Sequence, residues 1–270
     1  MSCAASNPQT DARASGAPAA VPAELASPVL YRPAPGEGPT IDRAEMLRYL
    51  GYAGQSIDDA LAERIESTAA ELEGTLAPRG VRRVFPIDAA ARNENGMPCI
   101  RLAGSTVELN GSDIFRHLKD ARLCVVLACT LGMESERRLR ALAGQRPLDA
   151  TLLDAAASAA IEATVRAMES EAMRDAAACG LSANWRFSPG YGDCPLSAQG
   201  PIVAALNAGR LIGLTVTDDD LLLPSKSVTA VFGLFDGEPH AANDRPSCSI
   251  CRLHGACPFR ERDTTCYSAL

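Results

Sequence analysis

A long alanine-rich segment, Asp149–Ala178, restricts the possible folds of this chain more than any other feature of its sequence. We predict a single helix here, because alanine favours helix formation and its small side chain allows close packing against a sheet or another helix. Shortly before it, Leu123–Ala128 is the most apolar strand candidate. Such an uninterrupted apolar run is typical of a strand buried on both faces. Together, the predicted helix and the predicted strand indicate a sheet with a central buried strand and helices packed against it.

The other predicted elements alternate between short helices and short strands. Asp42 can cap a first helix that ends before Gly51, and a polar, arginine-rich helix should follow Gly132. Further helices are expected at residues 57–76, from Ser112 or Asp113 to 119, and 197–209. Strands are expected at residues 81–87, 98–102, 106–109, 214–217 and 227–234. These elements predict an α+β fold, with a twisted, mainly antiparallel sheet, packed helices and a cysteine-rich C-terminal tail.

Composition divides the chain into three predicted parts. Residues 1–40 are rich in alanine, proline and serine, and we expect a disordered tail without the pattern of a secretory signal. Residues 41–240 are expected to form the folded domain, and residues 241–270 a cysteine-rich tail. No apolar run is long enough to span a membrane. The formal charge of −7 argues against binding to nucleic acid. Ten cysteines without a signal indicate a reducing compartment, so we expect a cytoplasmic protein.

The last segment of the chain carries four closely spaced cysteines. Cys248, Cys251, Cys257 and Cys266 have the spacing C-x2-C-x5-C-x8-C. Four thiolates can complete the tetrahedral shell of a zinc ion or hold an iron–sulfur cluster, and the spacing does not distinguish the two. His254 could replace one ligand, and unpaired thiols in a flexible tail are the alternative. The more scattered Cys124, Cys129, Cys179 and Cys194 are expected to fill the core.

The stretch Arg186–Pro195 carries the strongest indication of a binding site. Pro189 restricts one backbone angle, while Gly190 and Gly192 allow conformations closed to other residues. Arg186 is a forked donor for a carboxylate, and Tyr191 offers a flat face to a ring. Taken alone, Arg186 could instead form a structural salt bridge across a turn, and Tyr191 could pack in the core. Phosphate-loop, metalloprotease and nucleophile-elbow motifs are absent from the sequence.

Read as one unit, residues 186–234 resemble a known family. Arg186-x-x-x-Gly190-Tyr191 is followed by Ile212-Gly213-Leu214-x-x-Thr217 and then by Leu223-Pro224-x-x-Ser227-Val228. This order and spacing resembles the S-adenosylmethionine-binding activation domain of cobalamin-dependent methionine synthase. The upstream half looks like the free-standing bacterial version, in which the activation module is a separate subunit.

The resemblance implies a set of ligand-binding residues. Arg186 and Tyr191 would contact S-adenosylmethionine, the backbone of Ser188 would help to hold it, and Gly190 belongs to the same motif. Glu162 matches a family glutamate on the preceding helix that faces the ligand, whereas a solvated surface position is the usual setting of a helical glutamate. An aspartate near the start of the family domain and a late tyrosine have no clear counterpart here.

The resemblance also implies a function. The chain would be an activation subunit that supports reductive methylation of inactive Co(II) cobalamin, carried by a methionine synthase partner. A flavodoxin or a ferredoxin could supply the electron, and an iron–sulfur cluster on the terminal cysteines could pass it on. Two alternatives remain open: an iron–sulfur activator of another corrinoid methyltransferase, and a non-enzymatic binding module stapled by zinc.

Overall fold

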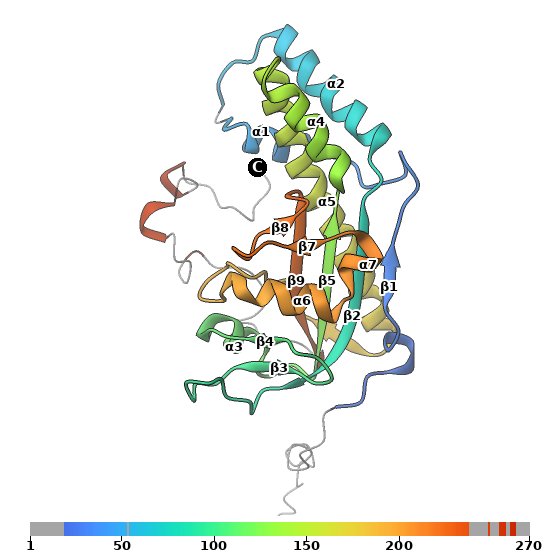
Figure 1. Cartoon of the computed structure of the whole chain (residues 1–270), viewed down its shortest axis with the longest axis vertical. Helices are drawn as coiled ribbons and strands as arrows, with labels where there is room; N and C mark the ends of the chain where they lie inside the picture. The colour runs from blue at the N-terminus through green and yellow to red at the C-terminus, as the bar shows by residue number, and fades with distance from the viewer. Residues whose placement is uncertain (1–18, 53, 238–247, 249–253, 258–259, 263–270) are drawn as a thin grey trace, which may run out of the picture.

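A computed structural model describes residues 19–52, 54–237, 248, 254–257 and 260–262 (Figure 1). Its main sheet has seven strands, in the order β4-β3-β2-β5-β9-β6, and β1 pairs with β2 outside this path. All of these pairings are antiparallel. A separate two-stranded hairpin consists of β7 and β8. The strands are β1 (Val29–Tyr31), β2 (Arg79–Asp88), β3 (Ile100–Leu102), β4 (Glu108–Leu109), β5 (Leu123–Thr130), β6 (Leu181–Ala183), β7 (Thr215–Val216), β8 (Leu222–Leu223) and β9 (Ser227–Asp236).

Helices cover both faces of this sheet. The long α5 lies behind the sheet in Figure 1, with α1, α2 and α4 beside its upper part, and α6 crosses the front. The α-helices are α1 (Arg43–Tyr49), α2 (Asp59–Thr75), α3 (Ser112–Leu118), α4 (Met133–Ala143), α5 (Pro147–Ala178), α6 (Gln199–Ala205) and α7 (Ala208–Ile212). Short 3-10 helices are η1 (Ala23–Leu25), η2 (Leu196–Ala198), η5 (His254–Ala256) and η6 (Arg260–Arg262). The predicted α+β class with a mainly antiparallel sheet is confirmed.

Strand β5 sits at the centre because both of its faces are apolar. Every residue of β5 is buried. Leu123, Val125 and Leu127 belong to the apolar core on the α5 side, whereas Cys124 and Val126 belong to the core beneath α3, α6 and α7. Side chains along a strand alternate between faces, so a continuous apolar run serves two cores at once. The prediction of a central strand at residues 123–128 is therefore confirmed.

Helix α5 packs on the sheet through small side chains. Its buried positions are dominated by alanine, which lets the helix backbone approach the strands: Ala155, Ala156, Ala157, Ala159, Ala160, Ala163, Ala172 and Ala176. Where α5 passes over β2, a side chain at Gly80 would collide with Met168. The predicted helix at residues 149–178 is confirmed, with a start at Pro147, a residue suited to the first helical turn.

The prediction of a disordered tail over residues 1–40 is wrong for its described part. Leu25, in η1, is buried in the core on the α5 side, and the Arg122 side chain donates to the Ala20 carbonyl. Strand β1 pairs with β2 through Val29, Leu30 and Tyr31. An alanine- and proline-rich composition suggested disorder, but a few apolar residues suffice to attach this segment to an open edge of β2.

Two further predictions about helix ends need correction. The expected helix at 197–209 is divided into η2, α6 and α7, because Asn207 adopts a left-handed conformation, with φ of 51°, that interrupts the helix. The N-cap of α3 is Gly111, and neither Ser112 nor Asp113 caps it with its side chain. Asp42 does cap α1, as predicted, by accepting from the backbone N–H groups of Ala44 and Glu45.

Within the described ranges, no helix is long and apolar enough to cross a membrane.

Candidate functional site

The candidate site is built around an arginine held by two glutamates. Glu162 and Glu169 lie seven residues apart on α5, close to two helical turns, so both side chains project from one face. The Arg186 guanidinium donates to the Glu162 carboxylate at 2.7 Å and to the Glu169 carboxylate at 2.7 Å. The backbone N–H of Arg186 also donates to Glu169, at 3.1 Å. All three side chains are partly buried. The two carboxylates thus position the guanidinium over the middle of α5.

The Arg186 guanidinium stays positively charged in this setting. Burial alone would lower the pKa of Arg186, but the negative charges of Glu169 and Glu162 outweigh that effect and raise it above its ordinary value. A guanidinium has more N–H donors than the two side-chain bonds use. The remaining donors suit a carboxylate, which arginine binds in a forked, bidentate way.

After Arg186 the chain first runs alongside β9 and then leaves the sheet. Phe187 exchanges two backbone hydrogen bonds with Val231, at 2.7 and 2.8 Å, so the chain is still attached to the sheet at this point. The Tyr191 N–H then donates to the Ser188 carbonyl at 3.1 Å, and the Gly190 N–H donates to the Cys194 carbonyl at 2.9 Å. These bonds close a compact loop, Ser188–Cys194, which presents Tyr191 at the surface.

Two glycines allow this loop to form, as the sequence predicted. Gly190 has φ of 93° and Gly192 has φ of 51°, both in the region that disfavours residues with a side chain. A side chain at Gly192 would also collide with Asp113 on α3. The loop is therefore pressed directly against the start of α3.

Asp193 attaches the loop to α3 by capping that helix from outside its own sequence. The Asp193 carboxylate accepts from the backbone N–H groups of Ser112, at 2.6 Å, and Asp113, at 2.9 Å. The first N–H groups of a helix have no partner within the helix, and a negative charge is favourable there. This cap explains why α3 has no side-chain cap of its own, and it couples α3 to the shape of the site.

Tyr191 stands at the outer end of a row of aromatic rings. The ring centroids of His117 and Trp185 are 4.5 Å apart, and those of Trp185 and Phe187 are 5.5 Å apart. The centroids of Phe187 and Tyr191 are 6.3 Å apart, with an angle of 70° between the ring planes. The Tyr191 side chain is 61% exposed, so the alternative in which Tyr191 packs in the core is wrong. Its hydroxyl lies within electrostatic reach of Arg186. The ring and the guanidinium therefore border the same region.

The structure brings the predicted residues Glu162, Arg186 and Tyr191 together. Glu162 is an ion-pair partner of Arg186 and not a solvated surface charge. Arg186 does form ion pairs, but with a helix 17 and 24 residues earlier in the chain, and not across a turn. Ser188 and Gly190 shape the loop between them. Ligand contacts by these residues remain predictions.

Comparison with known proteins identifies a similar fold but no similar sequence. No protein-family model matches the sequence, and no curated protein matches it. Among solved structures, the fold is similar to a protein described as the MetH reactivation domain bound to AdoHcy, with a TM-score of 0.59 over 89% of this chain and 87% of that one. The fold is that of a methionine synthase reactivation domain. Sequence identity is 15%, so the comparison establishes the reactivation-domain fold and not the ligand.

Within this reactivation-domain fold, sequence reasoning missed two residues of the site. Glu169 could have been found, because it shares a helix face with Glu162. Asp193 lies inside the predicted motif, but no local pattern indicates that its partner is the start of α3. Cys129, near Glu162, is buried, and burial, followed by the charge of Glu162, raises the pKa of its thiol to about 12, which favours the protonated thiol at neutral pH.

The predicted metal ligands are only partly covered by the structure. Cys248 and Cys257 are half-buried, while Cys251 and Cys266 lie outside the described residues. Over the residues the structure does describe, no three metal-ligating side chains come together. A zinc ion or an iron–sulfur cluster on the four cysteines stays a prediction. Cys124, Cys129 and Cys194 are buried in the core, as expected, and Cys179 is half-buried.

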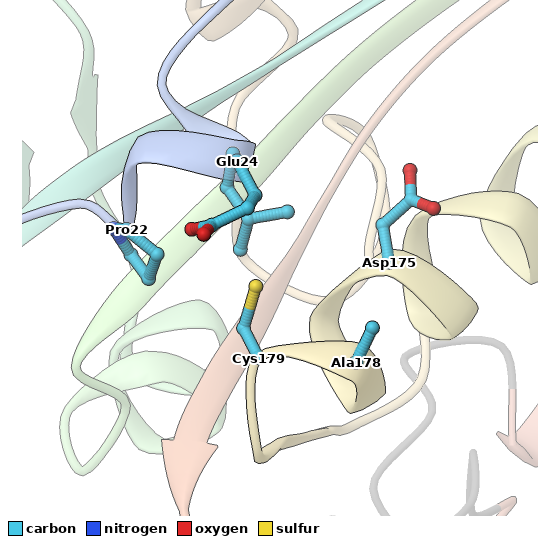
Figure 2. A pocket seen from close by; sticks show the side chains of 6 residues that line it. Pro22, Glu24, Asp175, Ala178 and Cys179 are labelled. Carbon is cyan, nitrogen blue, oxygen red and sulfur yellow. The ribbon is translucent and has the colours of Figure 1, made fainter.

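A surface pocket of about 550 Å³ lies between η1 and the C-terminal end of α5. Figure 2 shows the Cys179 sulfur on the side of Glu24, with the Asp175 carboxylate pointing away from both. Asp175 is paired with Arg82 of β2. The pocket is separated from Glu162 and Glu169 along α5, and its polar groups do not converge on one point. It is not part of the candidate site.

A buried histidine beneath the site should make the stability of the protein depend on pH. His117 donates from Nε2 to the Trp185 carbonyl at 2.7 Å, and burial lowers the pKa of His117 from 6.5 to about 4. Between these values the unfolded chain binds a proton that the folded chain does not, so stability should fall as the pH drops from 6.5 to 4. The shift corresponds to a loss of roughly 3 kcal/mol.

The measurement is the free energy of unfolding in denaturant at several pH values from 7 to 4. Carboxylates also titrate in this range, so the wild type should be compared with His117→Gln, which keeps a donor near Trp185 but does not titrate. The difference between the two proteins should change by roughly 3 kcal/mol across the range. If the free energy of unfolding falls with pH equally in both proteins, His117 does not cause the loss of stability.

Proposed function

We propose that this chain is an S-adenosylmethionine-binding activation subunit for a cobalamin-dependent methionine synthase. The observation that carries the proposal is the joint placement of Glu162, Arg186 and Tyr191 in a reactivation-domain fold. The similar solved structure is described as bound to AdoHcy, the product left when S-adenosylmethionine loses its methyl group. The arrangement of charges in this chain suits the same class of ligand.

The site holds charges of both signs that suit the charged groups of S-adenosylmethionine. The ligand carboxylate would bind the Arg186 donors that Glu162 and Glu169 do not use. The ligand ammonium and sulfonium are positive, and the Glu162 carboxylate would face them. Glu169 would continue to hold Arg186 through both its guanidinium and its backbone N–H. Tyr191, exposed at the edge of the loop, would stack on the adenine ring.

The proposed reaction needs a partner and an electron. One electron from an external reductant and the methyl group of S-adenosylmethionine pass to Co(II) cobalamin on the partner, and S-adenosylhomocysteine remains. This chain would contribute binding and orientation, which can account for a large part of a rate enhancement. A metal centre on the terminal cysteines, a flavodoxin or ferredoxin donor, and a cytoplasmic location belong to the same proposal.

The substitution Glu162→Gln tests whether the Glu162 carboxylate faces the ligand. The amide keeps the size of the side chain but loses the charge that would face the ligand cation. A charged hydrogen bond contributes on the order of 1.5–3 kcal/mol, so S-adenosylmethionine should bind roughly tenfold to a hundredfold more weakly. Calorimetric titration measures the change, and Glu171→Gln, also on α5, is the control. Unchanged affinity in Glu162→Gln would remove Glu162 from the ligand site.

The function itself is tested by a reactivation assay. The full chain is mixed with a methionine synthase partner holding Co(II) cobalamin, a chemical reductant and methyl-labelled S-adenosylmethionine. Label should appear on cobalamin only when the chain is present. Binding of the ligand without transfer of label would contradict the activation role while preserving the binding site. Absence of binding would contradict the whole proposal.

A further inference from the structure

Helix α1 ends beside the candidate site with an exposed aromatic residue that the predicted motif does not include. Tyr49 is the last residue of α1, and its side chain is 44% exposed. The Arg48 guanidinium lies 5.0 Å from the centre of the Tyr49 ring. Arg48 is held in turn by Glu45, at 2.7 Å. The Tyr49 ring therefore contacts an arginine that is itself held by a glutamate of the same helix.

The same cluster attaches the end of α1 to the face of α5 that carries Glu162. Glu45 is buried and also accepts from the side chain of Arg166. Arg166 lies four residues after Glu162 and three before Glu169, so all three project from one side of α5. Two groups of ion pairs thus lie next to each other on α5: one holds α1, and the other holds Arg186.

Electrostatics indicates that the Tyr49 hydroxyl lies near Glu162. Burial, followed by the charges of Glu162 and Glu45, raises the pKa of Tyr49 to about 12. Tyr191 is also within electrostatic reach of Tyr49. Tyrosines from two distant parts of the chain therefore lie in the neighbourhood of the Glu162–Arg186 pair.

We propose that Tyr49 forms the second wall of the ligand site and recognises the sulfonium group of S-adenosylmethionine through the face of its ring. This inference rests on the proposed function, because it takes the same ligand at the same site. Glu162 would face the cationic end of the ligand, and Tyr49 lies beside Glu162. An aromatic ring attracts a cation over its face, and Arg48 shows that this ring already has one as a neighbour. Arg48 is paired with Glu45, a carboxylate that it shares with Arg166.

The proposal predicts discrimination between two ligands that differ by one charge. S-adenosylmethionine carries a sulfonium, whereas S-adenosylhomocysteine has a neutral thioether at the same place. A ring that recognises the cation contributes to binding of the first ligand and little to binding of the second. Because a cation–π contact depends on the ring, the phenol hydroxyl should not be needed.

The experiment is calorimetric titration of the full chain with each ligand separately. Tyr49→Leu should weaken binding of S-adenosylmethionine by roughly tenfold, within the range of a desolvated cation–π contact, and change binding of S-adenosylhomocysteine by less than about twofold. Tyr49→Phe should bind both ligands as the wild type does. Tyr52→Leu, three residues later, is the matched control and should also behave as the wild type. Thermal unfolding checks that each variant is folded.

The possible outcomes separate this inference from the proposed function. If the wild type binds S-adenosylmethionine and Tyr49→Leu binds it equally well, Tyr49 is not part of the site, while the proposed function stands. Equal weakening for both ligands would overturn recognition of the sulfonium. A loss in Tyr49→Phe as large as in Tyr49→Leu would assign the effect to the hydroxyl and contradict the cation–π contact. A wild type that binds neither ligand would overturn both proposals.

Discussion

Arg186→Ala should reduce the affinity for S-adenosylmethionine by at least about a hundredfold. The ligand carboxylate would lose a bidentate partner, and two charged hydrogen bonds together contribute on the order of 3–6 kcal/mol. The mutation also leaves Glu162 and Glu169 without the cation that now joins them. Some loss of stability is therefore expected, on the order of 1–3 kcal/mol. Calorimetric titration gives the affinity, and denaturant unfolding gives the stability.

Two further variants keep the Arg186 prediction falsifiable if the alanine variant is poorly folded. Arg186→Lys retains the positive charge between the two glutamates but lacks the planar fork, so it should fold and still bind weakly. Arg137→Ala removes an arginine from α4 whose side chain is 73% exposed. This variant should leave the ligand affinity and the free energy of unfolding unchanged. Affinity in Arg186→Lys equal to that of the wild type would show that bidentate recognition of a carboxylate is not the role of this residue.

Gly111→Ala should destabilise the protein by roughly 3 kcal/mol or more and weaken ligand binding at a distance. Gly111 has φ of 129°, which a residue with a side chain rarely adopts. A methyl group there would also lie 2.8 Å from the backbone carbonyl oxygen of Asp193 and 2.9 Å from its carbonyl carbon. Backbone atoms cannot rotate away, so the loop that carries Tyr191 must shift. The backbone strain and the steric collision each contribute on the order of 1–3 kcal/mol.

The control for this substitution is a glycine in open surroundings. Gly144 follows α4, has φ of −83°, and has nothing close to the position of an added methyl group. Gly144→Ala should be neutral or slightly stabilising, by up to about 1 kcal/mol. Denaturant unfolding compares the two variants, and calorimetric titration under native conditions compares their ligand affinity. A Gly111→Ala protein as stable as Gly144→Ala would mean that the loop and α3 are not in tight contact.

Both predictions concern one loop that is held on two sides. Arg186 fixes its start to α5 through Glu162 and Glu169, and Asp193 fixes its end to α3. Between these attachments the loop rests on the row of rings that begins with His117. Mutations at these attachments to α3 and α5 should therefore change ligand affinity even when the mutated residue does not contact the ligand.

The sequence alone was sufficient for features that depend on neighbouring residues. Hydrophobic periodicity predicted α2 and the alanine-rich composition predicted α5, each to within two residues at each end, and the Asp42 cap marked the start of α1. The uninterrupted apolar run of β5 indicated its central place, because a strand buried on both faces has no polar alternation. The order of the arginine, glycine and tyrosine in the loop also indicated where to look for the site.

Tertiary structure alone decided which distant residues meet. The cap on α3 comes from Asp193, 81 residues after Ser112, and Glu45 meets Arg166 across 121 residues. No periodicity connects such pairs, because their contact depends on how whole elements pack. The same reason accounts for the placement of Tyr49 near Glu162. Strands as short as β6 and β8 could not be predicted from a sequence pattern either, because two or three residues define no period. The positions of these strands follow from the strands with which they pair.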